Sequence, residues 1–206
     1  MVSRALTWFL LLAFVTVTEV CADDTLPFDV PRDPRVLPKF AILETTKGPF
    51  TIELFGEEAP MSVRNFEFLA RRGTYNYVKF HKYMPNFIIQ GGDPTGTGKG
   101  GPGYSLPPEI NPVKHYRGTL GWARPAMKVN PERRSSGSQF YICLADAPHL
   151  DGFYTEFARV VAGMENVEML REGDRILTVR FPQDGQPATK RPDDPLMNRI
   201  ERLRTR

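Results

Sequence analysis

The chain has 206 residues, of which 41% are hydrophobic and 25% charged, a composition typical of one globular domain with additional length at its ends. Its 27 lysines and arginines exceed its 24 aspartates and glutamates by three, and the two signs are interspersed along the sequence. This balance argues against a nucleic-acid-binding protein, whose positive charge gathers on one surface.

The first 22 residues differ in composition from the rest of the chain. Arg4 supplies a positive charge, residues 5–17 form an apolar run, and the small residue Ala22 ends the segment. This pattern predicts a signal peptide on residues 1–22, cleaved after Ala22, and therefore an exported protein, periplasmic or secreted. A lipid anchor at Cys21 is the alternative, which the residues before it disfavour. The apolar run is too short to span a bilayer, so we expect no stable membrane insertion.

Residues 23–38 contain four prolines and no regular apolar spacing, which predicts an extended N-terminal segment. The domain itself is expected over residues 39–182. It opens with two strand-like runs, at 40–46 and 50–55, which surround Lys47-Gly48 and predict a hairpin.

The rest of the domain alternates between short apolar runs and turn residues. A helix is predicted over residues 60–72, where apolar residues repeat at helical spacing and Gly73 marks the end. A second helix is predicted over residues 165–171. Further strands are expected at residues 79–89, 120–123, 138–144, 157–161 and 176–181. This rhythm is typical of an antiparallel barrel or sandwich.

Residues 183–206 form a basic C-terminal tail. Asp194-Pro195 is a plausible start for a short helix. An acidic partner could contact its Arg199, Arg202, Arg204 and Arg206, but a solvated tail is the simpler interpretation.

The sequence shows no residues for a hydrolase, a metal enzyme or a nucleotide-binding protein. The glycine-rich stretch 96–101 is followed by Pro102, which forbids the helix that a phosphate-binding loop requires, so a flexible surface loop is expected. The three histidines, His81, His115 and His149, lack the short spacing of zinc ligands. No serine occupies a nucleophile elbow. We therefore expect neither a metal nor a cofactor.

Three motifs carry a resemblance to a known family. They are residues 80–93, with the sequence Phe-His-Lys-Tyr-Met-Pro-Asn-Phe-Ile-Ile-Gln-Gly-Gly-Asp, and residues 136–142 and 149–157. Each motif alone is more typical of a core strand with a turn. Together, and in this order, they resemble the hallmarks of the cyclophilin family of peptidyl-prolyl cis/trans isomerases across residues 40–181.

The resemblance implies a mainly β fold, a closed eight-stranded antiparallel β-barrel capped by two α-helices. It also implies proline-containing peptide segments as partners, and we expect a monomer. The barrier to rotation of a peptide bond, about 18–20 kcal/mol, comes from amide resonance, so an isomerase has only to favour the twisted amide. It needs no nucleophile and no metal.

The resemblance also implies roles for single residues. Lys82 would donate to the proline nitrogen, Gln90 would bind a substrate backbone group, and Gln139 would orient Lys82. The substrate-binding residues would be Phe87, Ile88, Ala123, Arg124, Tyr141, His149, Leu150 and Tyr154.

Four of these positions depart from the family pattern. Lys82 replaces an arginine, and a mobile point charge is positioned less well than a planar guanidinium. His149 stands where many members carry tryptophan, which predicts weak binding of the inhibitor cyclosporin. Arg124 replaces a frequent asparagine and makes the groove more basic, and Tyr154 replaces a histidine. Because of Lys82, a peptide-binding or chaperone module on the same barrel with weak isomerase activity is the alternative function.

Overall fold

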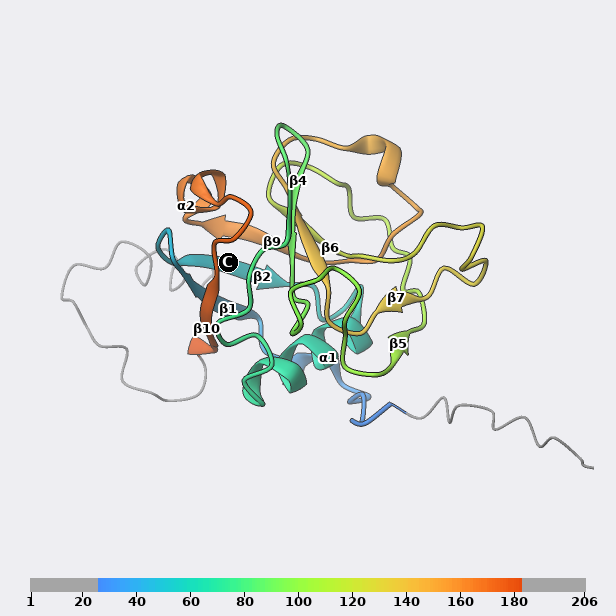
Figure 1. Cartoon of the computed structure of the whole chain (residues 1–206). Coiled ribbons are helices and arrows are strands. Elements are labelled where there is room, and N and C mark those ends of the chain that lie inside the picture. The colour runs from blue at the N-terminus through green and yellow to red at the C-terminus, as the bar shows by residue number, and fades with distance from the viewer. Residues whose placement is uncertain (1–25, 183–206) are drawn as a thin grey trace, which may run out of the picture.

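The structure is a computed structural model that describes residues 26–182. Eight strands form one curled antiparallel sheet in the order β10-β1-β2-β9-β6-β8-β4-β3 (Figure 1). They are β1 (Phe40–Thr45), β2 (Phe50–Leu54), β3 (Lys82–Met84), β4 (Ile88–Gly91), β6 (Thr119–Trp122), β8 (Phe140–Cys143), β9 (Glu156–Ala162) and β10 (Ile176–Arg180). A separate two-stranded pair consists of β5 (Ser105–Leu106) and β7 (Ser135–Ser136).

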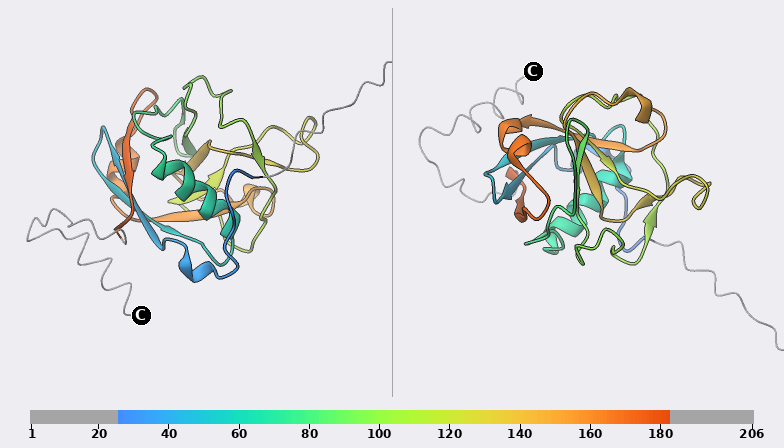
Figure 2. Two further views of the ribbon diagram at one scale, coloured as in Figure 1. Left: turned by 90° about the horizontal axis from the view of Figure 1, so that it is seen from below. Right: turned by 45° about the horizontal axis from the view of Figure 1, so that its top comes forward.

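Two α-helices accompany the sheet, as expected. Helix α1 (Pro60–Arg71) lies across one opening of the curled sheet, as the view from below shows (Figure 2), and α2 (Met164–Met169) follows β9. Two short 3₁₀ turns are η1 (Pro34–Val36) and η2 (Pro148–Leu150). Among residues 26–182, no helix is long and apolar enough to cross a membrane.

The closed barrel that we expected is not formed. The sheet has two ends, β10 and β3, so it is an open, curled half-barrel. An isolated bridge joins Lys79 to Arg175 beside these ends, and the backbone N–H of Phe80 donates to the carbonyl of Asp174 at 2.8 Å. Strand β3 has only three residues, too few to continue the ladder from β4 across to β10.

The predicted hairpin and the first helix are confirmed, but the single strand expected at 79–89 is wrong. A turn divides it into β3 and β4, which then pair with each other. Asn86, with φ of 56°, occupies the left-handed region that asparagine tolerates better than most residues, and Pro85 cannot donate to a ladder. Strands β5 and β7 were missed because two residues are too few to show a period.

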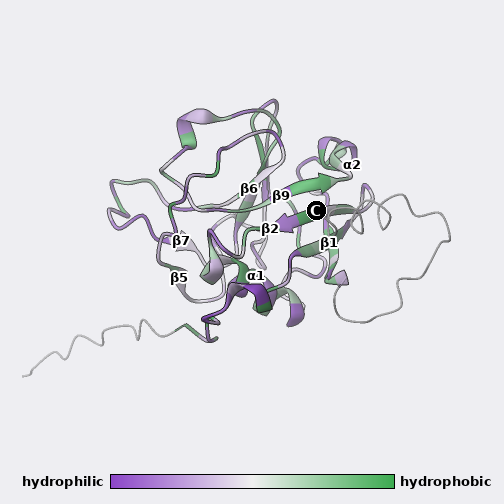
Figure 3. Ribbon diagram, turned by 180° about the vertical axis from the view of Figure 1, so that it is seen from behind, coloured by the Kyte–Doolittle hydropathy of each residue, from purple (hydrophilic) through white to green (hydrophobic). Residues whose placement is uncertain are grey.

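The core lies between the sheet and α1. The inner face of α1 contributes Val63 and Phe66, which are both fully buried. Figure 3 shows hydrophilic and hydrophobic residues alternating around this helix. Phe66 stacks on Tyr75, with the ring centroids 5.3 Å apart, and Trp122 stacks on Phe157 at 4.4 Å. Burying a side chain of the size of Phe stabilises the fold by about 1.5–3 kcal/mol, so these aromatic pairs anchor the sheet on which the site is built.

The N-terminal segment is described from Leu26 onward. It is interrupted by the 3₁₀ turn η1, and Phe28 packs against Phe68 of α1 with centroids 5.3 Å apart. Leu37 is buried in the core. The predicted signal peptide and the predicted tail helix lie outside the described residues.

Candidate active site

A groove of about 500 Å³ opens on the sheet beside β3, β4, β6 and β8. Nine of the residues that the resemblance singled out line it: Lys82, Phe87, Ile88, Gln90, Ala123, Arg124, Tyr141, Leu150 and Tyr154. His81, Thr97 and Gly98 complete the lining. The fold thus brings together residues that lie far apart in the sequence, from Lys82 to Tyr154. Gln139 and His149 stand outside this lining, each in contact with a residue of it.

Several site residues are aligned in one row across the sheet. Lys82 lies opposite Gln90, Gln90 opposite Tyr141, and Tyr141 opposite Gly121. A shift in register then places Gly121 opposite Glu156. Directly opposite residues project from the same face of a sheet, so this row faces the groove side while the alternate residues fill the core.

Lys82 is exposed, and within residues 26–182 its side chain makes no hydrogen bond or ion pair. Its ammonium group sits on a flexible four-carbon stem. The cation is therefore available to a ligand in the groove.

The side-chain amide nitrogen of Gln90 contacts two neighbouring side chains. Its Nε2 donates to Oε1 of Gln139 at 3.0 Å and lies 3.4 Å from Nε2 of His81. Gln139 in turn donates to the carbonyl of Gly100 at 2.8 Å. Gln139 thus contacts Gln90, whereas the resemblance implied that it orients Lys82. No hydrogen bond to the Oε1 atom of Gln90 is found among residues 26–182, so this atom of a groove-lining side chain is left as an acceptor.

Asp93 organises the glycine-rich loop beside the groove. Its carboxylate accepts hydrogen bonds at 2.7–3.0 Å from the backbone amides of Thr95, Thr97, Gly98 and Gly100. Burial alone would raise the pKa of Asp93, but these hydrogen bonds and the one from the Thr95 hydroxyl outweigh it and hold the pKa well below its usual value. The carbonyl of Gly100 therefore stands at a fixed place for Gln139. The loop expected to be a flexible surface element is tied together by one side chain.

The rim of the groove contains three of the departures from the family pattern. His149, on η2, stacks on Phe87 with centroids 5.4 Å apart. The guanidinium of Arg124 lies 4.5 Å from the ring centre of Tyr154, a cation–π contact, and its Nε donates to the carbonyl of Phe153 at 2.9 Å. Arg124 is thus held in place, in contrast to Lys82.

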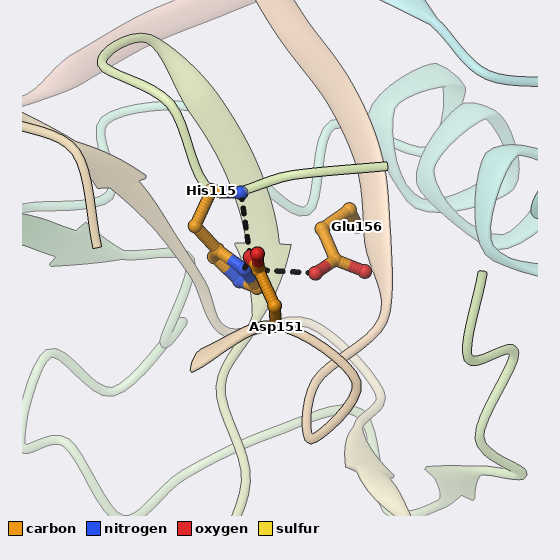
Figure 4. Close-up of side chains that lie close together, drawn as sticks. All are labelled: His115, Asp151 and Glu156. Carbon is orange, nitrogen blue, oxygen red and sulfur yellow. Dashed lines mark hydrogen bonds and ion pairs between the residues drawn. The ribbon is translucent and has the colours of Figure 1, made fainter. Parts of the chain in front are cut away.

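A buried cluster that the sequence analysis missed lies behind Tyr141. Nε2 of His115 is 2.8 Å from the Tyr141 hydroxyl. Figure 4 shows the other side of the ring, where Nδ1 of His115 is 3.0 Å from Asp151 and 2.8 Å from Glu156. The donor atoms of His115, Asp151 and Glu156 lie within 4.8 Å of one another, so these residues have the composition of a metal site. The available signal was Glu156 itself, a carboxylate at the start of a strand run that is mostly apolar.

The curled eight-stranded sheet with its two helices is the cyclophilin fold. Residues 40–193 match the family described as cyclophilin type peptidyl-prolyl cis-trans isomerase/CLD. The chain therefore belongs to the cyclophilin family and is a peptidyl-prolyl cis-trans isomerase.

Bacterial relatives agree with this assignment. The chain is 44% identical over 146 residues to a peptidyl-prolyl cis-trans isomerase of Synechococcus elongatus, covering 70% of this chain and 97% of that protein. It is 37% identical over 163 residues to one of Helicobacter pylori, covering 77% and 96%.

Solved structures agree as well. A cyclophilin type isomerase of Cryptosporidium parvum is similar with a TM-score of 0.65 at 34% identity, covering 70% of this chain and 97% of that one. The structure of that protein in the presence of the dipeptide Ala-Pro gives a TM-score of 0.64 at 33% identity, covering 69% and 98%.

Proposed function

We propose that this isomerase accelerates X-Pro rotation in exported proteins by binding proline in the groove and stabilising the twisted amide. The observation that carries the proposal is that a lysine side chain without a partner among the described residues lies beside an apolar pocket. Lys82 stands directly across the β3–β4 ladder from Gln90, and Phe87, Tyr141 and Leu150 line the same groove.

The apolar members would grip the proline ring. Ile88 and Tyr141 are buried, and Phe87 is partly buried and backed by His149. Burial of the ring against them supplies binding without any polar group that must lose its water. The Oε1 atom of Gln90 would accept from a substrate backbone N–H, while Ala123 and Arg124 would lie along the substrate backbone.

The ammonium of Lys82 would favour the twisted amide. Rotation removes the resonance of the amide and leaves a lone pair on the proline nitrogen, which either planar form lacks. A hydrogen bond donated by Lys82 to this nitrogen is stronger in the transition state than in the ground state, which is the condition for raising the rate. No covalent bond is formed or broken, so the reaction requires neither a nucleophile nor a metal.

The test is cis/trans exchange of an Ala-Pro or Phe-Pro peptide with and without the protein. We expect acceleration by the parent and a large loss with Phe87→Ala, because truncating the ring opens the pocket. Absence of acceleration by the parent, with peptide binding retained, would favour the second candidate, a peptide-binding or chaperone module. The mobile charge of Lys82 is the observation that motivates that candidate.

The exported location is a separate part of the proposal. It is supported by the charged start, apolar run and small terminal residue of residues 1–22. Cell fractionation with N-terminal sequencing should find the protein in the periplasm or medium with Asp23 as its first residue. An N-terminus at Met1 on the cytoplasmic protein would contradict it.

A further inference from the structure

Directly behind the groove, His115 links a groove residue to two carboxylates. The side chains of His115 and Glu156 are fully buried, and Tyr141 is 3% exposed. The rings of His115 and Tyr141 are nearly parallel, at 15°, with centroids 6.0 Å apart. A change in His115 is therefore transmitted to the aromatic floor of the groove through packed side chains as well as through the 2.8 Å contact between Nε2 and the Tyr141 hydroxyl.

The backbone is adapted to this contact at Gly121. A Cβ atom at this position would lie 2.4 Å from the hydroxyl oxygen of Tyr141 and 2.6 Å from Cζ. Only glycine lets the Tyr141 ring lie across β6 and reach His115. Because Gly121 pairs with both Tyr141 and Glu156, the strand register also carries the carboxylate to the same cluster.

The chemistry of the partners fixes where the protons of His115 lie. Nδ1 faces two carboxylates, Asp151 at 3.0 Å and Glu156 at 2.8 Å, and carboxylates only accept, so Nδ1 carries a proton. Asp151 is also bonded to the backbone N–H of His115, at 2.9 Å, and lies 3.4 Å from Nζ of Lys114. Its charge is thus already matched by Lys114.

Glu156 has no such second partner. Neither of its buried oxygens has a hydrogen bond of good geometry within the described residues, and its one close charged neighbour is His115. A buried carboxylate requires an opposite charge beside it, which favours the imidazolium form of His115. Burial lowers the pKa of His115, but Glu156 and Asp151 outweigh it, and the pKa lies above its usual value.

We propose that His115 and Glu156 are positioning residues for the groove: Glu156 keeps His115 charged, and the charged ring holds Tyr141 in place through its Nε2–H. This inference rests on the proposed function. Charged His115 donates to the Tyr141 oxygen, a charge-assisted hydrogen bond. Neutral His115 instead accepts the Tyr141 proton in a weaker bond, and the Tyr141 ring is held less firmly against the proline.

The same three residues could in principle share a divalent ion, and the geometry points to a proton instead. Nδ1 makes a hydrogen bond of 3.0 Å to Asp151 and an ion-pair contact of 2.8 Å to Glu156, and a protonated Nδ1 has no lone pair for a metal. Asp151 Oδ1 also accepts the backbone N–H of His115. The experiment nevertheless includes zinc and a chelator, because a metal would account for the cluster in a different way.

Other titratable groups also surround the cluster and the groove. Tyr154 meets the His115 ring edge at 6.3 Å, Lys114 pairs with Asp151, and Cys143 lies beneath the groove with its pKa raised by burial to about 12. His81 lines the groove and His149 lies at its rim. Burial is the main cause that lowers the pKa of His81. Its ring is therefore mostly neutral already at the ordinary pKa of histidine. A matched variant is needed to separate these groups from His115.

The experiment measures KM and kcat for a Phe-Pro peptide between about pH 6 and pH 9, a range that begins near the ordinary pKa of histidine. For the parent we expect KM to rise roughly fivefold as pH rises through the pKa of His115, because the charge-assisted bond is lost. Tyr141→Phe lacks only the hydroxyl, so its KM should not follow this titration. Glu156→Gln should move the rise to lower pH and raise KM more than it lowers kcat.

The outcomes separate cleanly. A KM rise of the same size in Tyr141→Phe, or a flat parent profile, overturns the inference while leaving the isomerase function intact. A parent without exchange activity overturns the proposed function instead. The ring-nitrogen NMR shifts of His115 then still test the cluster, since they should report the charged form at neutral pH in the parent and the neutral form in Glu156→Gln.

A change in KM caused by Zn²⁺ or by a chelator in the parent but not in Glu156→Gln assigns a metal site and also overturns the inference. Should Glu156→Gln fail to fold by circular dichroism, the Tyr141→Phe profile decides alone.

Discussion

The Oε1 atom of Gln139 accepts a hydrogen bond from Nε2 of Gln90 across 3.0 Å, so one glutamine behind the groove orients the other inside it. Because Gln139 also donates to the carbonyl of Gly100, it connects the sheet to the glycine-rich loop. The amide of Gln90 in the groove is thus held by a buried partner, and that partner is held by a loop that a single aspartate organises.

The link between the two glutamines predicts the effect of changing the hidden one. Gln139→Leu should reduce kcat/KM about tenfold or more, because small misplacements of a binding group cost a large factor in rate. Gln139→Glu retains an acceptor for Gln90 and should lose less. Peptide exchange assays on both variants and on Gln90→Ala check this. If Gln139→Leu and Gln90→Ala have additive effects in the double variant, the two residues act independently and the proposed orientation is wrong.

Lys82 provides a second prediction, on catalysis itself. Lys82→Ala should lower kcat/KM by about 10- to 100-fold, since a donor to developing charge is removed. The side chain is exposed, so the free energy of unfolding should change little. Lys82→Arg restores a cation and should recover activity. The assay is the same exchange measurement, with urea unfolding as the control; full activity in Lys82→Ala would exclude the role that we assign to it.

Asp93 predicts how stability depends on pH. Its folded-state pKa lies below the unfolded-state value of about 3.9, so its contribution is present above that value and is lost as pH falls through it toward the folded-state pKa. Asp93→Asn should lower the free energy of unfolding by about 1–3 kcal/mol at neutral pH, because the charge and one of the two oxygens that accept from the loop amides are lost. The difference from the parent should shrink at about pH 3. Urea unfolding at both values measures it, and an equal difference at both would contradict the linkage.

His149 predicts a change in inhibitor binding. The ring stacks on Phe87 at the rim of the groove, at the position where many family members carry tryptophan. Indole offers more apolar area and an N–H donor, so His149→Trp should strengthen cyclosporin binding about tenfold over a weakly binding parent. Calorimetric titration of both proteins decides it. Tight binding by the parent would show that His149 serves as well as tryptophan.

Much of the fold was accessible from the sequence because its signals are local. The alternation in residues 50–54 and the helical spacing between Pro60 and Gly73 predicted β2 and α1, and the structure confirms both elements. The motif 80–93 was recognisable as a unit. Its division into two strands was missed, because the left-handed Asn86 ends one strand within a run whose composition still favours strand.

The sequence alone determined the family, through it the mainly β architecture with two helices, and nine of the positions that line the groove. Tertiary structure alone decided that the sheet stays open, that Gln139 contacts Gln90, and that His115, Tyr141 and Glu156 meet behind the groove. The physical reason is that periodicity and motifs describe neighbours along the chain. The contacts that orient the site are instead set by which strands pair and in which register, and a shift of one residue would turn Glu156 away from the cluster.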